Sequence, residues 1–448
     1  MSPELQYDIQ LNKFFYSADM LTARMLTRLG YARDIKAFLN FLQYARGKKD
    51  WRAATSDDHL AYLVWRREDA DGPRVSPSTW DREVSAVDRF YKWQILGGHA
   101  LENPIPQRQK RSGSYHQGRQ GNAQTPATYS RSARREDVSW LPASSYRQWR
   151  DVGLRGYTAH GTPDPEFRGR WAERNAAFSD LMVRTGLRLT EQSSLITPEI
   201  PSDSGKHGYE RFRLPGAIAK GGSARWIYIP TKVLRSLLGY INIDRRACVK
   251  QAQKKGTYDN VATRYIYIAE HRKTSTVHSK RTNEICNARI SQLSTEERQR
   301  LMVEGPDGWE PASLWLTEAG LPMSSSTWQD IFHTANRRCA KHGVDARAHP
   351  HKLRHTFAVL TLEQLQRGHI AELGQLQQHQ RTQYTRVFGD PLDWVRQRLG
   401  HKSVTTTQEY LHALEELELE TRTKLLRDDA TDIAESSTAT TPIDGGYL

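Results

Sequence analysis

The sequence predicts a mainly α-helical protein with a small β-sheet, arranged as two domains. Its 448 residues exceed what one ordinary hydrophobic core supports. Apolar residues recur at helical spacing within about residues 1–105 and again later in the chain. Strand-like stretches flank the dipeptide Gly221-Gly222. We therefore expect a helical domain at 1–106, a basic linker at 107–136, a mixed α/β domain at 137–427 and a disordered tail at 428–448.

The chain is strongly basic, with 65 Lys+Arg against 51 Asp+Glu, a formal net charge of +14 and a pI near 9.6. This balance favours a polyanionic partner, and nucleic acid rather than a membrane surface. The sequence has no apolar run long enough to cross a bilayer, and its first residues lack the pattern of a signal peptide. We expect a soluble, cytoplasmic protein.

Metal and nucleotide cofactors are not expected. The three cysteines, Cys248, Cys286 and Cys339, are isolated from one another in the sequence, so we predict that all three are reduced. The sequence contains no P-loop, no H-E-x-x-H motif and no cluster of carboxylates. Any reaction is therefore expected to proceed without ATP or a bound metal ion.

Two helices of the first domain can be placed from their apolar period. One carries Ile35, Phe38, Leu39 and Leu42 on a single face. Another is expected to begin at Ser76-Pro77, because serine caps helix N-termini and proline suits the first turn. Its inward positions are Trp80, Val84, Val87, Tyr91 and Gln94, and its other faces carry Arg82, Arg89 and Lys92. These three cations are candidate DNA contacts, although a solvated helix surface explains them equally well.

Residues 107–135 carry seven basic side chains and no acidic one. Such a segment suits a strap along a phosphate backbone, since neutralised phosphates release counterions and make binding steeply salt-dependent. A flexible, solvated linker is the alternative. The candidate DNA contacts in this linker are Arg108, Lys110 and Arg111.

In the second domain, a helix is predicted over Glu173–Thr185, and Gly186 suits a left-handed helix end. Arg188 then lies just beyond this helix, with Glu191 available as an ion-pair partner. Lys220 flanks the predicted Gly-Gly turn between two strands, which places its ammonium group at a hairpin tip. Arg225, on the strand that follows the turn, is a further candidate DNA contact.

The most informative motifs lie near the C-terminus. His351-Lys352-Leu353-Arg354-His355-Thr356-Phe357-Ala358 is followed by Leu399-Gly400-His401 and then by Tyr410. A phosphodiester under attack needs fixed donors for its oxygens, and arginine forks together with imidazoles supply them. A late tyrosine can supply the nucleophile. Taken singly, each arginine could equally form a structural ion pair, and each histidine could be a packing residue.

Together with Thr185-Gly186-Leu187-Arg188-Leu189-Thr190-Glu191, these segments resemble the tyrosine recombinase (phage integrase) family. The resemblance covers about residues 31–425 and implies a C-shaped DNA clamp, formed by a helical core-binding domain and a mainly helical catalytic domain with a small sheet. It implies that Arg188 and Arg354 clamp the phosphate and that Lys220 protonates the departing 5′ oxygen. It also implies that His351 and His401 donate to phosphate or move protons and that Tyr410 is the nucleophile. His355 is expected to support these residues from behind or to pack a helix, and Tyr384 is a rival nucleophile by proximity only.

The resemblance also implies partners. These are double-stranded DNA with an inverted-repeat core site, a homotetramer on that DNA and an accessory directionality protein, in a nucleoid-associated location. The helix expected around Leu411, Leu414 and Leu417 is a candidate for docking on a neighbouring copy. Residues 234–311 and the Gln-rich 364–383 are predicted to be surface insertions, and the chain is expected to begin directly with the core-binding helices.

Three functions fit these observations. The first is site-specific strand exchange that integrates, excises or resolves a mobile element. The second is type IB topoisomerase activity, which shares the chemistry. The third is a catalytically silent DNA-binding regulator, which all six filled catalytic positions disfavour.

Overall fold

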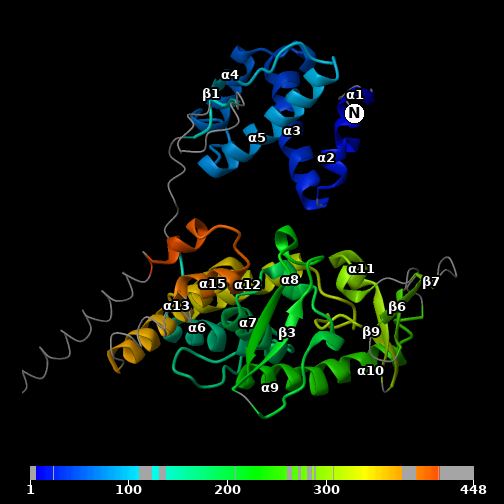
Figure 1. Cartoon of the computed structure of the whole chain (residues 1–448), viewed down its shortest axis with the longest axis vertical. Coiled ribbons are helices and arrows are strands. Elements are labelled where there is room, and N and C mark those ends of the chain that lie inside the picture. Colours follow the sequence, from blue (N-terminus) through cyan, green and yellow to red (C-terminus); the bar gives the residue numbers. More distant parts are fainter. Residues whose placement is uncertain are drawn as a thin grey trace, which may run out of the picture. The chain divides into compact units, whose positions relative to one another are not determined.

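In a computed structural model, the chain divides into two compact units, residues 1–136 and 137–448 (Figure 1). The structure describes residues 7–23, 25–109, 124–130, 138–206, 208–259, 265–270, 274–279, 285–286, 289–305, 307–375, 390–411 and 413. The division falls where the second domain was predicted to begin. The predicted tail at 428–448 lies outside the described residues.

The first unit is helical, as predicted. The face of α3 that carries Ile35, Phe38 and Leu42 is buried against α5, and Ser76 caps α5 by accepting from the Thr79 amide at 3.2 Å. All five predicted inward residues of α5 are buried, which confirms both helix predictions. The elements of this unit are α1 (Ile9–Lys13), η1 (Phe14–Tyr16), α2 (Ala18–Leu21), α3 (Met25–Ala45), η2 (Trp51–Ala53), α4 (Ser56–Arg67), α5 (Pro77–Leu96), β1 (Gln107–Gln109) and β2 (Gln124–Pro126).

The described part of the predicted linker belongs to the first unit. Strands β1 and β2 pair antiparallel, and the residues after β2 return to the helices. The Trp80 indole donates to the Thr128 carbonyl at 2.8 Å, and the Ser130 amide donates to Asp81 at 2.7 Å. These bonds hold residues 124–130 against α5 rather than leaving them as a free tether.

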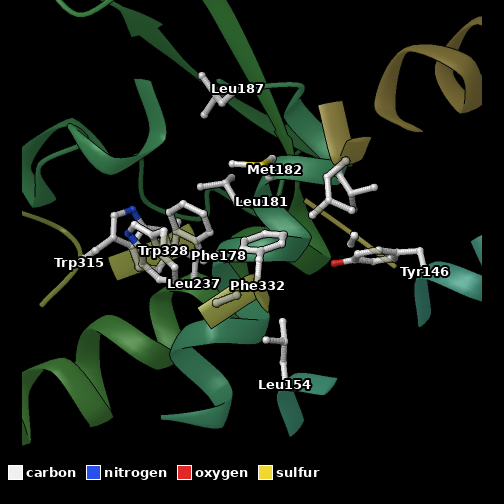
Figure 2. Packing of buried hydrophobic residues seen from close by; sticks show 14 of the residues in the cluster. Tyr146, Leu154, Phe178, Leu181, Met182, Leu187, Leu237, Trp315, Trp328 and Phe332 are labelled. Carbon is white, nitrogen blue, oxygen red and sulfur yellow. The ribbon is translucent and has the colours of Figure 1, made fainter. Parts of the chain in front are cut away.

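The second unit is built around α7 (Ala172–Thr185). Its side chains pack against α9, α13 and the aromatic residues of α12. Figure 2 shows the centre of this core, where the Phe178 and Trp328 rings stack at 3.5 Å and the Trp315 ring lies edge-on to both. The helices of this unit are α6 (Ala143–Trp149), α7, α8 (Leu189–Ser193), α9 (Thr231–Tyr240), α10 (Arg246–Lys254), α11 (Thr295–Gln299), α12 (Ser325–Lys341), α13 (Pro350–Gln375) and α15 (Pro391–Leu399), with short turns η3 (Arg150–Arg155), η4 (Thr197–Glu199), η5 (Lys220–Gly222), η6 (Ile241–Arg245) and η7 (Ile290–Gln292).

Two sheets complete the second unit, so the predicted mainly α fold with a small β part is confirmed. Strands β3 (Tyr209–Leu214) and β4 (Arg225–Pro230) form the predicted hairpin, although β4 begins later than expected and η5 occupies the turn. The other sheet has the order β7-β6-β5-β8-β9, and its β5–β8 pair is parallel. Its strands are β5 (Tyr265–Glu270), β6 (Thr274–Ser279), β7 (Ile285–Cys286), β8 (Leu301–Gly305) and β9 (Gly308–Pro311).

The segment 234–311, predicted as a surface insertion, thus builds a sheet. It lies at the opposite side of the unit from α13 and α15 (Figure 1). Leu301 and Val303 of β8 pack in a small hydrophobic cluster of their own with Ile196 and Ala312. The Gln-rich insertion begins as a continuation of α13, and its residues 376–383 lie outside the described part.

Cys248 and Cys339 are buried free thiols, in agreement with the prediction, whereas the side chain of Cys286 lies outside the described part. Among the described helices, none combines the length and the apolar character needed to span a membrane.

Candidate active site

Arg188 is placed by the end of α7 and the start of α8. Gly186 ends α7 in the left-handed conformation (φ 65°), as predicted, and an added Cβ there would collide with the Phe357 ring. Two residues later, Arg188 precedes α8, and its amide donates to the Glu191 carboxylate at 3.0 Å. Its guanidinium donates to the same carboxylate at 3.0 Å, so the predicted Arg188–Glu191 pair is present. This partly buried guanidinium also lines a cleft, which is described below.

Glu191 is fully buried and also accepts from Arg225 at 2.6 Å. Arg225 is itself only 7% exposed and donates to the Arg398 carbonyl at 2.8 Å. Burial alone would raise the pKa of the Glu191 carboxyl, but hydrogen bonds and charge from Arg225 and Arg188 outweigh it and lower the pKa to about 2. The buried Glu191 carboxylate thus binds the guanidinium groups of both Arg188 and Arg225.

We expect Glu191→Gln to destabilise the protein in a pH-dependent way. The folded-state pKa is depressed from 4.5 to about 2, so the carboxylate contributes stability above the unfolded-state pKa and loses it as the pH falls between these values. The shift corresponds to about 3 kcal/mol at neutral pH. Urea unfolding of both proteins at pH 7 and pH 3 measures the effect. An equal difference at the two pH values would contradict the ion-pair role.

Lys220 lies in η5 at the tip of the β3–β4 hairpin, as predicted, and its side chain is exposed. Its backbone amide points to Glu191 at 3.4 Å, which ties the hairpin tip to the carboxylate that holds Arg188. Its neighbour Gly221 adopts φ 68°, and the Lys402 side chain lies within van der Waals distance of a Cβ placed there. The tip therefore brings a second cation next to Lys220.

Helix α13 supplies His351, Arg354 and His355 from one stretch. Arg354 is 2% exposed; its guanidinium donates to the carbonyls of Gly186 and, at 2.5 Å, of Leu399. Burial, reinforced by Arg188, lowers the pKa of Arg354 to about 9, so the group stays charged at neutral pH. This arginine joins the ends of α7 and α15 to the start of α13.

His401 follows the left-handed Gly400 at the end of α15. Its Nε2 lies 3.3 Å from an Arg354 Nη2, and its Nδ1 lies 3.0 Å from the Thr407 hydroxyl. Because arginine only donates, Nε2 must accept, and Nδ1 then carries the proton and donates to Thr407. Burial and the charge of Arg354 lower the pKa of His401 to about 3, in keeping with this neutral tautomer.

Tyr410 lies in the helical segment 405–411 and is 2% exposed. Its ring is nearly parallel to that of His401, with centroids 6.3 Å apart. Its hydroxyl lies 2.9 Å from His355 Nδ1. Burial raises the pKa of the Tyr410 phenol to about 12, so the phenol is protonated in the free protein.

Four predicted catalytic residues line a single cleft of about 390 Å³. His401 is hydrogen-bonded to one of them, and Tyr410 is hydrogen-bonded to His355, which does not line the cleft. His401 reaches Arg354 directly, and Tyr410 reaches His355, whose ring stacks on His351 with centroids 4.5 Å apart. The cleft is lined by Arg188, Lys220, His351 and Arg354 together with Leu189, Thr190, Gln329, Phe332, His333, Asn336, Ala348, His349 and Pro350. Arg188, Lys220, His351 and Arg354 thus share one cleft, and His401 and Tyr410 lie next to two of the residues that surround it.

The candidate DNA contacts differ from one another in exposure and in their ion-pair partners. Arg82, Arg89 and Lys92 are partly exposed but pair with Asp34, Asp19 and Asp88 respectively. Arg108 is exposed, and Lys110 and Arg111 lie outside the described residues. The assignment of Arg225 as a DNA contact needs correction, because its buried guanidinium is bound to Glu191 and the Arg398 carbonyl. Arg225 supports the site from behind.

Two features of the site were not predicted. Thr407, which fixes the His401 tautomer, lies in the Thr405-Thr406-Thr407 run that follows the Leu-Gly-His motif, but no spacing rule singled it out. The inward direction of Arg225 did have a signal, because it shares strand parity with the apolar residues Ile227 and Ile229. Its positive charge was given more weight than this alternation.

Comparison with known proteins gives similarity to recombinases. Residues 20–98 match the family model described as the phage integrase N-terminal SAM-like domain. The chain is 23% identical over 389 residues to the tyrosine recombinase XerC of Lactobacillus delbrueckii subsp. bulgaricus, covering 86% of this chain and 88% of that protein.

Solved structures give the same result for the fold. The XerH recombinase in a post-cleavage complex with a palindromic difH substrate has a TM-score of 0.50 at 14% identity, covering 92% of this chain and 83% of that one. The Tn1549 transposon integrase with a circular intermediate DNA also has a TM-score of 0.50, at 12% identity, covering 90% and 93%. The fold is that of these DNA strand-exchange recombinases. The chain is similar in sequence to a tyrosine recombinase, and its residues 20–98 are similar to the phage integrase N-terminal domain.

Proposed function

We propose that the protein is a site-specific recombinase that cuts and rejoins DNA strands through a 3′-phosphotyrosyl intermediate. The observation that carries this proposal is the single cleft lined by Arg188, Lys220, His351 and Arg354. His401 is hydrogen-bonded to Arg354, and Tyr410 is hydrogen-bonded to His355 on the same helix. Two fixed guanidinium groups suit the non-bridging oxygens of a phosphate in the transition state. A phenol beside them suits in-line attack on phosphorus.

The proposed reaction needs neither ATP nor a metal ion. Tyr410 Oη bonds to phosphorus while the bond to the 5′ oxygen breaks, and the Lys220 ammonium protonates that oxygen. The phosphotyrosyl bond conserves the energy of the phosphodiester, so a 5′ hydroxyl from another strand can reverse the step. His351, exposed at the mouth of the cleft, is placed to donate to phosphate.

The proposed substrate is double-stranded DNA with an inverted-repeat core site. The net charge of +14 supports a DNA partner, and the related XerH structure holds a palindromic substrate. Integration, excision or resolution of a mobile element is the proposed role, in line with the related transposon integrase. We place the protein in the cytoplasm at the nucleoid, with an accessory directionality protein as a further partner.

Strand exchange between two duplexes requires several copies, and we propose a tetramer on DNA. A groove of about 480 Å³ in the catalytic unit supports it, with Trp226, Tyr228 and Trp394 among its lining residues and Arg398 stacked on two of these rings. The sequence after Tyr410 alternates leucines with glutamates, a composition that suits this aromatic and basic groove. Truncation after Ala413, which removes most of these leucines and the glutamates, should abolish synapsis while single-site binding persists; intact synapsis would count against docking of this segment.

Covalent trapping tests the proposed function. Nicked suicide DNA drawn from the flanks of the encoding gene is incubated with the protein and then denatured. We expect a denaturant-resistant protein–DNA adduct, and sequencing of the trapped DNA would locate the site. Binding without an adduct on the correct flanks would instead favour a silent DNA-binding regulator, and relaxation of plasmids without any such site would favour a topoisomerase.

Alanine at Arg108, Lys110 and Arg111 together should flatten the salt dependence of DNA binding. Each phosphate that the variant no longer neutralises reduces the slope of log K against log salt by about 1. Titrations of wild type and the triple variant between about 50 and 200 mM salt, an interval across which affinity can change about 10³-fold, measure the slope. Alanine at Lys341, an exposed cation paired with Glu166, is the matched control. An unchanged slope would make the segment an ordinary linker.

A further inference from the structure

The hydroxyl of the nucleophile has a defined partner in the free protein. Tyr410 Oη lies 2.9 Å from His355 Nδ1, and the two rings are tilted at 53° with centroids 5.6 Å apart. The distance is that of a hydrogen bond between a phenol and an imidazole nitrogen. His355 therefore touches the reacting atom, and it does so from the helix that also carries Arg354.

His401 and His351, the other two candidate histidines, contact other groups. Both nitrogens of His401 have partners, since Nε2 faces Arg354 and Nδ1 faces Thr407. His351 lines the cleft with Arg188 and Lys220, and its ring stacks on His355 at an interplanar angle of 10°, whereas the hydrogen bond of the Tyr410 hydroxyl is to His355. Neither is placed to receive the phenolic proton.

The surroundings of His355 keep its imidazole neutral and able to accept. His349, His351 and Arg354 face it from its own helix and the residue before that helix, and Tyr410 and His401 face it from the segment after α15. Burial, followed by His351 and Arg354, lowers the pKa of His355 to about 4. A neutral imidazole that carries its proton on Nε2 presents a free lone pair at Nδ1.

We propose that His355 is the general base of strand cleavage and accepts the phenolic proton of Tyr410 at Nδ1. This inference rests on the proposed function and adds a residue to it. As the Tyr410 Oη–phosphorus bond forms and the phosphorus–O5′ bond breaks, the proton of Oη passes to His355 and a proton of Lys220 passes to O5′. Rejoining reverses both transfers, so His355⁺ returns its proton to the departing phenol.

Single-turnover cleavage of nicked suicide DNA tests the proposal with two variants. His355→Ala removes the base, and His355→Asn keeps an acceptor oxygen near the position of Nδ1 that does not take a proton at neutral pH. Both should lose about 10²- to 10⁴-fold in cleavage rate at pH 7 with little change in DNA affinity. Added imidazole should partly restore His355→Ala. His160→Ala, at an exposed histidine of the same unit, should cleave like wild type and ignore imidazole.

The pH profile gives a second readout. The wild-type rate should be nearly flat between about pH 6 and 8, because the base stays neutral there, while both variants should gain about tenfold per pH unit as hydroxide replaces the base. A purely structural loss would lower the rate equally at every pH. A wild-type rate for His355→Asn would reduce His355 to a positioning residue and overturn the proposal.

DNA with a sulfur-bridged 5′ leaving group separates base from acid, because a thiolate departs without protonation. It should restore Lys220→Ala, the proposed acid, and leave His355→Ala slow. Restoration of His355→Ala by this DNA would place His355 at the leaving group and overturn the proposal. A wild-type protein that forms no adduct on any site would instead overturn the proposed function, which is a separate result.

Discussion

Tyr410→Phe should abolish the denaturant-resistant adduct while DNA binding persists. The variant loses only the hydroxyl, which is the nucleophilic atom, so no phosphotyrosyl bond can form at this position. The ring remains in its buried place beside His401, and the loss of one hydrogen bond to His355 should cost about 1 kcal/mol of stability. Trapping on suicide DNA, together with a binding titration, measures both effects.

Tyr384 offers the matched control for this experiment. It is the rival nucleophile by sequence proximity and lies outside the described residues. Tyr384→Phe should form as much adduct as wild type. An adduct that survives Tyr410→Phe and disappears in Tyr384→Phe would reassign the nucleophile and with it the whole C-terminal motif.

Alanine at Arg188 and alanine at Arg354, the two arginines of the proposed phosphate clamp, should have different effects on stability. Arg188→Ala should slow cleavage by about 10²- to 10³-fold and leave the fold nearly intact, because Arg188 is partly exposed and its partner Glu191 keeps Arg225. Arg354→Ala should slow cleavage at least as much and also destabilise the catalytic unit by about 2–4 kcal/mol. Its buried guanidinium satisfies the carbonyls of Gly186 and Leu399, which would be left without it.

Cleavage rates and urea unfolding of the two variants separate these contributions. Lysine at each position is the useful comparison, since it keeps the charge but cannot bridge two carbonyls. Arg354→Lys should therefore remain clearly less stable than wild type, although it keeps the positive charge. A proportionate loss of DNA affinity in Arg188→Ala would contradict its assignment to the transition state, because the many other cations of the chain should sustain binding.

Local patterns predicted the parts of the fold that depend on local chemistry. The serine cap of α5, the apolar faces of α3 and α5, and the left-handed end of α7 each follow from residues close in sequence. The candidate catalytic residues were also identified from the sequence alone, because their types and spacing form rare motifs. Their convergence on one cleft required the structure, since the cleft joins residues of α8, the hairpin tip and α13.

The features that the sequence did not predict depend on contacts between residues far apart in the chain. The five-stranded sheet contains a parallel β5–β8 pair. The chain between these two strands runs through β6, β7 and α11, so no local turn signal announces this pairing, unlike the antiparallel β5–β6 and β8–β9 pairs. The charge of Arg225 suggested an outward residue, whereas its partner Glu191 lies on another element and makes an inward guanidinium stable. His355 was expected behind the site, and only the fold of the segment after α15 brings Tyr410 to it.

Gly400 lies where the segment that leads to Tyr410 packs against the hairpin that carries Lys220. At this left-handed residue, a side chain would press on Ser223 and Arg225 of the hairpin, so the backbone that leads to His401 and Tyr410 lies directly on the element that carries Lys220. The proposed proton donor Lys220 and the proposed nucleophile Tyr410 are therefore carried by segments that pack directly on one another. If DNA binding orders the hairpin, we expect it to position Tyr410 as well. A copy whose hairpin is out of place would then have both Lys220 and Tyr410 misplaced, so each active site would be either fully assembled or inactive.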